Sequence, residues 1–89
     1  MLDKSTEEYN TKLIQFLEKE GYENLRVLED GTVCATLELI FTRSICIGLN
    51  YQSWEKRFCF SDRELAVTEL NKLKTGDDEP VGYVARRNG

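Results

Sequence analysis

The apolar residues of this chain recur with two different spacings, and the change from one to the other separates helices from strands. In residues 5–21, Tyr9, Leu13, Phe16 and Leu17 follow one another at intervals that place them on a single face of an α-helix. Charged residues occupy the opposite face of this segment. The first element is therefore predicted to be an amphipathic helix with one buried side.

From residue 24 onward apolar residues alternate with polar ones, which is typical of strands with one buried face. Asp30-Gly31 is a two-residue turn signal, and it predicts a β-hairpin in which Leu25 and Val27 lie beside Cys34. After this turn every second residue is apolar, and these residues are predicted to face the core: Val33, Ala35, Leu37, Leu39 and Phe41.

The same alternation predicts two further strands. A three-residue turn, TRS, keeps the apolar sides of neighbouring strands together by pairing Leu39 with Ile47. Pairing of Ile47 with Phe58 would then set Cys46 directly opposite Cys59, with their Cβ atoms about 4.5 to 5.5 Å apart.

Residues 61–76 return to helical spacing. Ser61 and Glu64 form a capping box at the start of this second helix. An acidic loop, residues 77–80, leads to a short last strand in residues 81–87. The predicted order of elements is therefore α-β-β-β-β-α-β.

These elements predict an α+β fold in a single domain, residues 1–89. We expect two layers, in which a mainly antiparallel sheet of four to five strands carries both helices on one face. Because a chain of this length buries one modest core, the second face of the sheet would stay uncovered.

The charge and composition exclude several classes of protein. The net charge of −4 opposes nucleic-acid binding, which requires a basic face. No apolar run reaches the roughly 18 residues of a membrane span. The first residues also lack the pattern of a signal peptide, so we expect a cytoplasmic protein.

The residue types of common catalytic sites are missing. The chain has no histidine, which removes Ser-His and Cys-His nucleophile pairs. Cys34, Cys46 and Cys59 lack C-x-x-C spacing and are expected to be free thiols. A thiolate at Cys59 beside Arg57 would lack a general base, and the acidic loop lacks the EF-hand spacing. We therefore expect no enzyme, no cofactor and no metal site.

The second face of the sheet is the predicted binding surface for a partner protein. It combines small residues with apolar groups and one arginine, and the adjoining hairpin tip adds two aromatic residues. Tyr, Trp and Arg are enriched in the energetically dominant positions of interfaces. The predicted partner-binding residues are Ile40, Cys46, Tyr51, Trp54, Arg57 and Cys59. A second hypothesis is that this face binds another copy of the chain.

A nucleic-acid surface is the alternative reading of the same region. It would use the 51–57 hairpin with four basic residues: Lys56, Arg57, Arg86 and Arg87. Adjacent residues of a strand point to opposite faces, so Lys56 and Arg57 are not expected to form one patch. This geometry favours the protein-binding hypothesis.

The C-terminal part of the chain also resembles a known group of proteins. The stretch EKRFCFSDRELAVTELNKL, followed by GDDEPVGYVARRNG, resembles small phage- or prophage-encoded proteins over residues 55–89. These have an aromatic-Cys-aromatic strand, a short helix, an acidic Gly/Pro turn and a last strand similar to YVARRG. The resemblance implies an accessory protein in the cytoplasm of a bacterial host. It also implies a protein of the kind that binds and inhibits host machinery such as nucleases or defence complexes.

Overall fold

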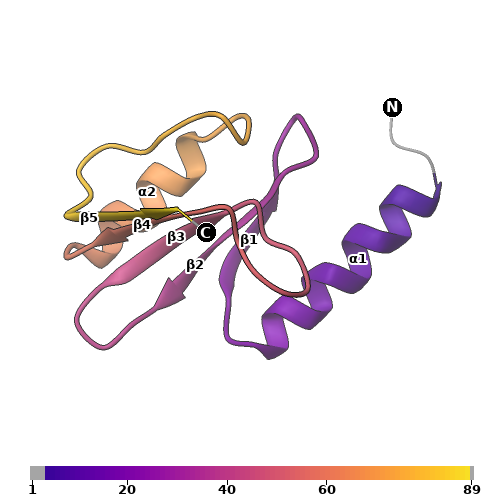
Figure 1. The fold of residues 1–89 in the computed structure, drawn as a ribbon, viewed down its shortest axis with the longest axis horizontal. Coiled ribbons are helices and arrows are strands. Elements are labelled where there is room, and N and C mark those ends of the chain that lie inside the picture. The colour runs from indigo at the N-terminus through magenta and orange to yellow at the C-terminus, as the bar shows by residue number, and fades with distance from the viewer. Residues whose placement is uncertain (1–3, 89) are drawn as a thin grey trace.

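The computed structural model describes residues 4–88, with side chains described from Asn10 onward (Figure 1). Tyr9, which was assigned to the buried face of the first helix, lies outside the described side chains. The elements are α1 (Lys4–Lys19), β1 (Glu23–Val27), β2 (Val33–Glu38), β3 (Arg43–Ile47), β4 (Lys56–Phe60), α2 (Arg63–Lys72) and β5 (Ala85–Asn88).

The five strands form one sheet in the order β1-β2-β3-β4-β5, and each neighbouring pair is antiparallel. This confirms the α+β class and the predicted order of elements. The last strand is shorter than predicted, because it begins at Ala85 rather than at residue 81.

The two helices lie on opposite faces of the sheet, so the prediction of both on one face is wrong. Leu70 of α2 packs in a cluster with Ile45 and Phe58, which defines the α2 face. Leu13 of α1 packs in a second cluster with Ala35, on the α1 face. Strand β2 is buried on both sides, since its consecutive residues from Val33 to Thr36 are all buried. Figure 1 shows α1 beside β1, and α2 packs across β2, β3 and β4 on the other face.

The first hairpin turn also differs from the prediction. The Leu28 N–H donates to the Thr32 carbonyl at 2.8 Å, and the Gly31 N–H donates to the Leu28 carbonyl at 2.9 Å. Gly31 has φ +86°, the left-handed conformation that a three-residue loop requires. The loop therefore has three residues rather than two, and it sets Val27 opposite Val33 instead of beside Cys34.

The second hairpin turns earlier than predicted. The Leu39 N–H donates to the Thr42 carbonyl at 2.8 Å, so the tip is Ile40-Phe41 and not TRS. Ala35 pairs with Cys46, and the predicted pairing of Leu39 with Ile47 is wrong. The prediction failed because the apolar alternation continues beyond the strand into the turn, where Ile40 and Phe41 are exposed and do not face the core.

The β3–β4 register differs from the prediction by two residues. Cys46 lies opposite Arg57, and Cys59 lies opposite Ser44. The predicted direct pair of Cys46 and Cys59 is therefore wrong, although a shift of two keeps both on the same face. All three cysteines are free.

Helix α2 begins with a different cap from the one predicted. The Asp62 side chain, not that of Ser61, accepts the N–H groups of Glu64 and Leu65 at 3.0 and 3.1 Å. Asp is among the strongest N-cap residues. Ala66 and Leu70 of this helix, together with Leu73 at its C-cap, are buried against the α2 face of the sheet.

Candidate partner-binding surface

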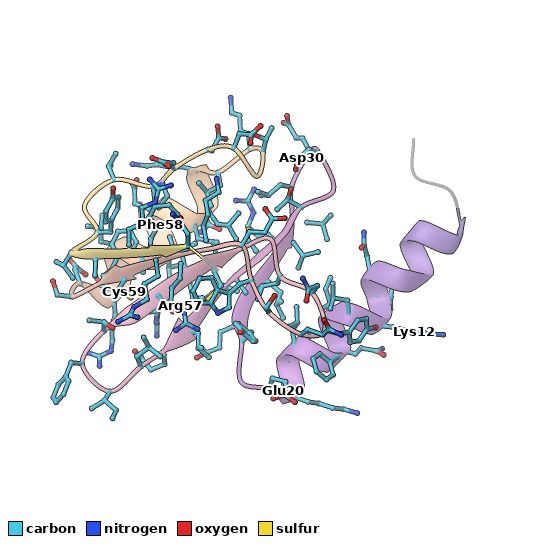
Figure 2. All side chains as sticks on the ribbon, in the orientation of Figure 1. Lys12, Glu20, Asp30, Arg57, Phe58 and Cys59 are labelled. Carbon is cyan, nitrogen blue, oxygen red and sulfur yellow. The ribbon has the colours of Figure 1, made fainter. Side chains whose placement is uncertain are left out.

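The α1 face is only partly covered. Helix α1 packs at the β1 end of the sheet, and α2 lies on the other face, so no described helix covers β4 and β5 on this side. Figure 2 shows Arg57 and Cys59 together on one side of β4 and Phe58 on the other. Two grooves occupy the uncovered region, and they share Trp54.

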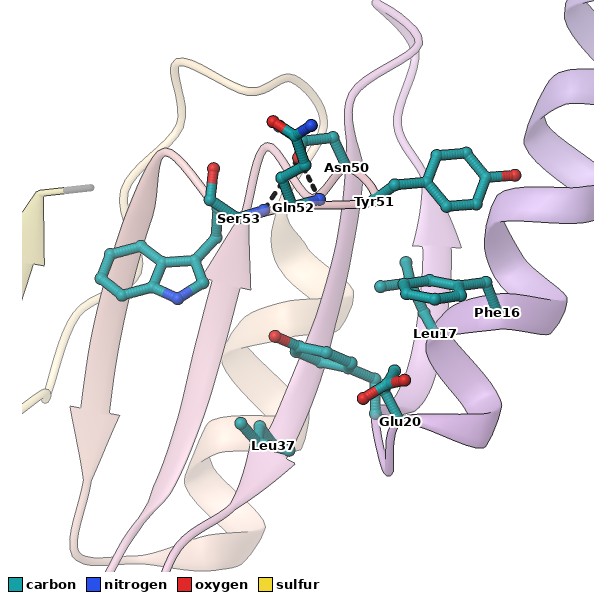
Figure 3. A pocket seen from close by; sticks show the side chains of 10 residues that line it. Phe16, Leu17, Glu20, Leu37, Asn50, Tyr51, Gln52 and Ser53 are labelled. Carbon is teal, nitrogen blue, oxygen red and sulfur yellow. Dashed lines mark hydrogen bonds between the residues drawn. The ribbon is translucent and has the colours of Figure 1, made fainter.

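The first groove lies between α1 and the β3–β4 connection, and we call it the aromatic groove. Its volume is about 460 Å³. Phe16 and Tyr51 meet across it with ring centroids 5.0 Å apart (Figure 3). Its lining residues are Phe16, Leu17, Glu20, Tyr22, Leu37, Asn50, Tyr51, Gln52, Ser53 and Trp54.

The connection that carries Tyr51 and Trp54 has a defined conformation. The Asn50 Oδ1 accepts the N–H groups of Gln52 and Ser53 at 2.7 and 2.8 Å, as Figure 3 shows. An Asx-type turn of this kind fixes the backbone on either side of it. The backbone that carries Tyr51 and Trp54 therefore forms a defined turn.

The second groove lies over β4 and β5, and we call it the arginine groove. Its volume is about 550 Å³, and Arg57 and Arg87 face each other in it as cross-strand partners. None of the described residues that line it is acidic. These lining residues are Leu39, Trp54, Arg57, Cys59, Arg87 and Asn88.

Arg57 is the central side chain of the surface. Its guanidinium carbon lies 4.5 Å from the centroid of the Trp54 ring, a cation–π arrangement. Its Nε is buried and has no hydrogen-bond partner among the described residues. Burial raises the pKa of the Tyr22 phenol and of the Cys46 thiol, and the nearby Arg57 charge offsets only part of each increase. Arg57 is thus a half-buried cation that lies over the Trp54 ring and close to the Tyr22 hydroxyl and the Cys46 thiol.

Four of the six predicted partner-binding residues come together on this surface: Tyr51, Trp54, Arg57 and Cys59. Cys46 belongs to the same face but is fully buried beneath it. Ile40 lines neither groove, because it sits at the β2–β3 hairpin tip with 84% of its surface exposed. Ile40 and Cys46 are therefore not placed to line the grooves.

Several residues of the surface were missed by sequence reasoning. Phe16 and Tyr22 were not assigned to it, because α1 was expected on the opposite face. The spacing of Phe16 also fits the buried apolar face of its helix, so the sequence did not indicate that this residue lines a groove. Arg87 was considered only for nucleic acid, and its pairing with Arg57 depends on a register that the sequence does not specify.

The four basic residues of the nucleic-acid alternative do not share one face. Lys56 Nζ donates to the Gly76 carbonyl at 2.9 Å. Arg86 pairs with Glu79 at 2.7 Å and lies over the Phe58 ring. Only Arg57 and Arg87 remain together on the α1 face.

The acidic loop, residues 77–80, makes hydrogen bonds with the backbone of the preceding segment. The Asp78 carboxylate accepts the N–H groups of Lys74 and Thr75 at 2.7 and 3.1 Å, and these bonds lower its pKa. Asp30 accepts the Gly76 N–H at 2.9 Å. Within residues 4–88, no three metal-ligating side chains gather at one place. Neither described helix is long and apolar enough to cross a membrane.

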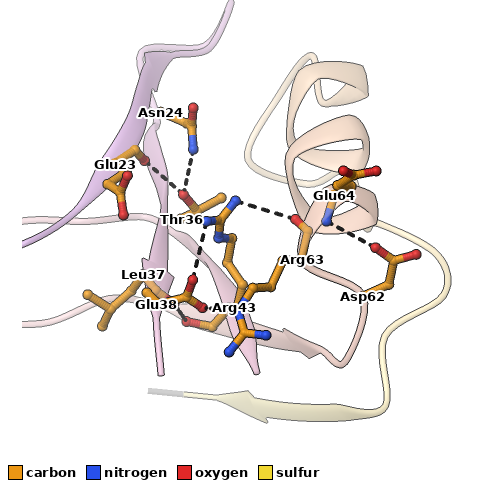
Figure 4. A network of polar contacts seen from close by, with 10 residues as sticks. Glu23, Asn24, Thr36, Leu37, Glu38, Arg43, Asp62, Arg63 and Glu64 are labelled. Atoms are coloured by element: carbon orange, nitrogen blue, oxygen red, sulfur yellow. Dashed lines mark hydrogen bonds and ion pairs between the residues drawn. The ribbon is translucent and has the colours of Figure 1, made fainter. Parts of the chain in front are cut away.

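A polar network closes the far end of the α2 face. Glu38 binds Arg63 at 2.8 Å and Arg43 at 3.3 Å (Figure 4). The same figure shows Thr36 between Asn24 and the Glu23 carbonyl, where β1 has an irregular register. These exposed pairs link the β2–β3 hairpin to the start of α2.

Comparison of the chain with protein-family models, with curated proteins and with solved structures found no match. The fold itself places the chain in the class of α+β domains, with helices on opposite faces of a five-stranded antiparallel sheet. The function is inferred from the geometry of the two grooves.

Proposed function

We propose that this chain is a non-enzymatic protein-interaction domain that binds its partner through the aromatic and arginine grooves. The observation that carries the proposal is the aromatic groove, where Phe16, Tyr51 and Trp54 line an open hollow of about 460 Å³. Aromatic side chains contribute large contact areas, and clusters of them are typical of interface centres.

The partner that fits this surface is a protein segment with bulky apolar side chains. The grooves adjoin at Trp54, so one extended segment would contact both. The chain has no histidine and three free thiols, all buried, which fits a binding role in a reducing compartment such as the cytoplasm.

The resemblance of residues 55–89 to phage-encoded accessory proteins extends the proposal. It suggests that the partner is a bacterial host protein, such as part of a nuclease or defence complex, and that binding inhibits it. This extension is carried by the resemblance alone, whereas the binding surface is inferred from the fold.

Site-specific photo-crosslinking tests the surface. A photoreactive phenylalanine analogue replaces Tyr51, at the rim of the aromatic groove, in cells of the host. The matched control carries the same analogue at Thr68, which is exposed on α2 on the opposite side of the sheet. We expect a partner that crosslinks from position 51 and not from position 68.

The crosslinked partner is then purified, and its binding to the unmodified chain is measured. Trp54→Ala should weaken binding by about tenfold or more, as for a residue at an interface centre. The proposal is wrong if both positions crosslink the same proteins or if Trp54→Ala binds the purified partner as tightly as the wild type. A crosslink between two copies of the chain would assign the surface to self-association.

A further inference from the structure

Arg57 and Arg87 form a pair of like charges that the described structure does not neutralise. They are direct cross-strand partners on β4 and β5, so their Cβ atoms lie about 4.5 to 5.5 Å apart. The described residues provide no ion pair for either guanidinium. By contrast, the neighbouring Arg86 on the other face is paired with Glu79.

The position of the pair points to an anionic ligand. Like charges directly opposite each other destabilise a sheet, and a half-buried cation is stabilised when an anion approaches it. The chain has a net charge of −4, yet the described residues that line the arginine groove include two arginines and no carboxylate side chain. The groove is therefore a local positive hollow on an acidic protein.

The geometry suits a carboxylate. Arginine presents planar sets of N–H donors that match the two oxygens of a carboxylate, and two guanidinium groups from adjacent strands can share one such group. Asn88 also borders the groove, but its pairing with Lys56 directs its side chain to the opposite face of the sheet. The remaining walls, Leu39 and Trp54, are apolar.

We propose that Arg57 and Arg87 together bind an acidic side chain of the partner segment, whose adjacent apolar side chain packs against Trp54 in the aromatic groove. This inference rests on the proposed function and names the chemistry of the partner. The charge complementarity of the arginine groove and its continuity with the aromatic groove through Trp54 support one occupant for both.

A nucleic-acid strand fits the surface less well. Such a strand carries a charge on every nucleotide and is bound by a series of basic contacts. Here two arginines share the face, and Lys56 and Arg86 are turned away and engaged with Gly76 and Glu79. Glu20 at the aromatic groove would repel a phosphate backbone that extended beyond Trp54.

Two capped tetrapeptides test the proposal on the full chain. The first has the sequence Glu-Glu-Leu-Phe, and the neutral control has the sequence Gln-Gln-Leu-Phe. Binding is followed by NMR through the Nε–H signal of Arg57 and the indole N–H signal of Trp54. We expect the acidic peptide to shift both signals and the neutral peptide to bind about tenfold more weakly or worse, because the charge-assisted hydrogen bonds are lost.

Matched variants on one strand locate the site. Arg87→Gln should weaken the acidic peptide by about tenfold. Arg86→Gln removes a charge one residue away on the opposite face and should leave the affinity within about twofold, because long-range surface charges are screened. Both residues are exposed, and an unchanged amide spectrum shows that each variant is folded.

The anion site is wrong if the two peptides bind equally, if Arg87→Gln binds like the wild type, or if the acidic peptide shifts no signal at millimolar concentration. A short oligothymidylate that binds more tightly than the peptide, with a steep dependence on salt, would assign the arginines to nucleic acid instead. A partner crosslinked from position 51 whose affinity ignores Arg87→Gln would keep the proposed function and reject the anion site. If the acidic peptide binds and Arg87→Gln weakens it, but no partner is crosslinked from position 51, the anion site is kept and the partner-binding function is rejected.

Discussion

Arg57 and Arg87 carry both a structural cost and the proposed role in binding an anion. Arg57 lies over Trp54 and is half-buried, and Arg87 is exposed at the edge of the sheet. Neither has a carboxylate partner among the side chains of residues 10–88. Their repulsion should be measurable as a loss of stability.

Arg87→Glu should therefore stabilise the protein while it abolishes binding of an acidic ligand. The new carboxylate faces Arg57, and we expect the free energy of unfolding to rise by about 0.5 kcal/mol. Arg86→Glu is the control on the same strand, and it should lower stability slightly because it loses the pair with Glu79. Urea denaturation measures both changes, and equal signs for the two variants would contradict this account.

The three cysteines should differ in reactivity with a thiol reagent. Burial raises the pKa of Cys34 to about 11, and Cys34 and Cys46 are fully buried, so neither presents a thiolate to the solvent. Cys59 is 8% exposed and lines the arginine groove. Under native conditions Cys59 should be labelled first, as mass spectrometry of timed samples would show. Labelling of Cys34 at the same rate as Cys59 would contradict the packing of the α2 face.

At the level of elements, the β3–β4 connection decides the shape of the aromatic groove. The N–H groups of Gly48 and Leu49 both donate to the Val33 carbonyl at 3.0 Å. Gly48 has φ +77°, and a Cβ there would come within 2.7 Å of the Glu55 side chain. This turn buries Leu49 against α1 and places Tyr51 and Trp54 beside Phe16.

Gly48→Ala should therefore destabilise the fold by about 2 kcal/mol or more, from the left-handed conformation and the contact with Glu55 together. Gly21→Ala is the control, since Gly21 also has positive φ but has open space around its Cα. It should cost about 1 kcal/mol from conformation alone. Chemical denaturation gives both values, and equal costs would mean that the contact with Glu55 relaxes freely.

At the scale of the whole molecule, the segment between α2 and β5 ties distant parts of the chain together. The Gly76 N–H binds Asp30 in the first hairpin turn, and the Val81 N–H donates to buried Glu69 at 3.0 Å. Backbone hydrogen bonds are the main cause that lowers the pKa of Asp30, of Glu69 and of Asp78. Each carboxylate is thus stabilised in its charged form when the protein is folded.

These lowered pKa values predict a loss of stability in acid. A carboxyl group whose pKa is lower in the folded state stabilises the fold above its unfolded pKa, and this contribution is lost as the pH falls through the folded pKa. The free energy of unfolding should therefore decrease as the pH is lowered below about 5. Thermal unfolding across this range measures the slope.

Glu69→Gln should make the slope shallower, because the charged acceptor of the Val81 N–H is removed. Lys72→Gln should have a smaller effect, because it removes only the second cause, the ion pair at 2.9 Å, and keeps the Val81 hydrogen bond. A slope unchanged by Glu69→Gln would show that this carboxylate does not link the segment to the core.

The amino-acid sequence by itself determined the identity and order of the elements. The spacing of Leu13, Phe16 and Leu17 and the alternation around Phe58 and Phe60 are local properties, since each follows from the geometry of one helix or one strand. The clustering of Tyr51, Trp54 and Arg57 was also predicted, because these residues are close in the chain.

Only the tertiary structure decided which side chains of neighbouring strands lie on the same face of the sheet. A turn of three residues at Gly31 and an earlier tip at Ile40 changed the strand registers, and a change of one residue moves a side chain to the other face of the sheet. Strand β2 is buried on both sides although one of its faces carries Cys34 and Thr36, so its alternation did not show that both faces would be covered. The pairing of Arg57 with Arg87 likewise depends on the β4–β5 register, which joins residues far apart in the chain.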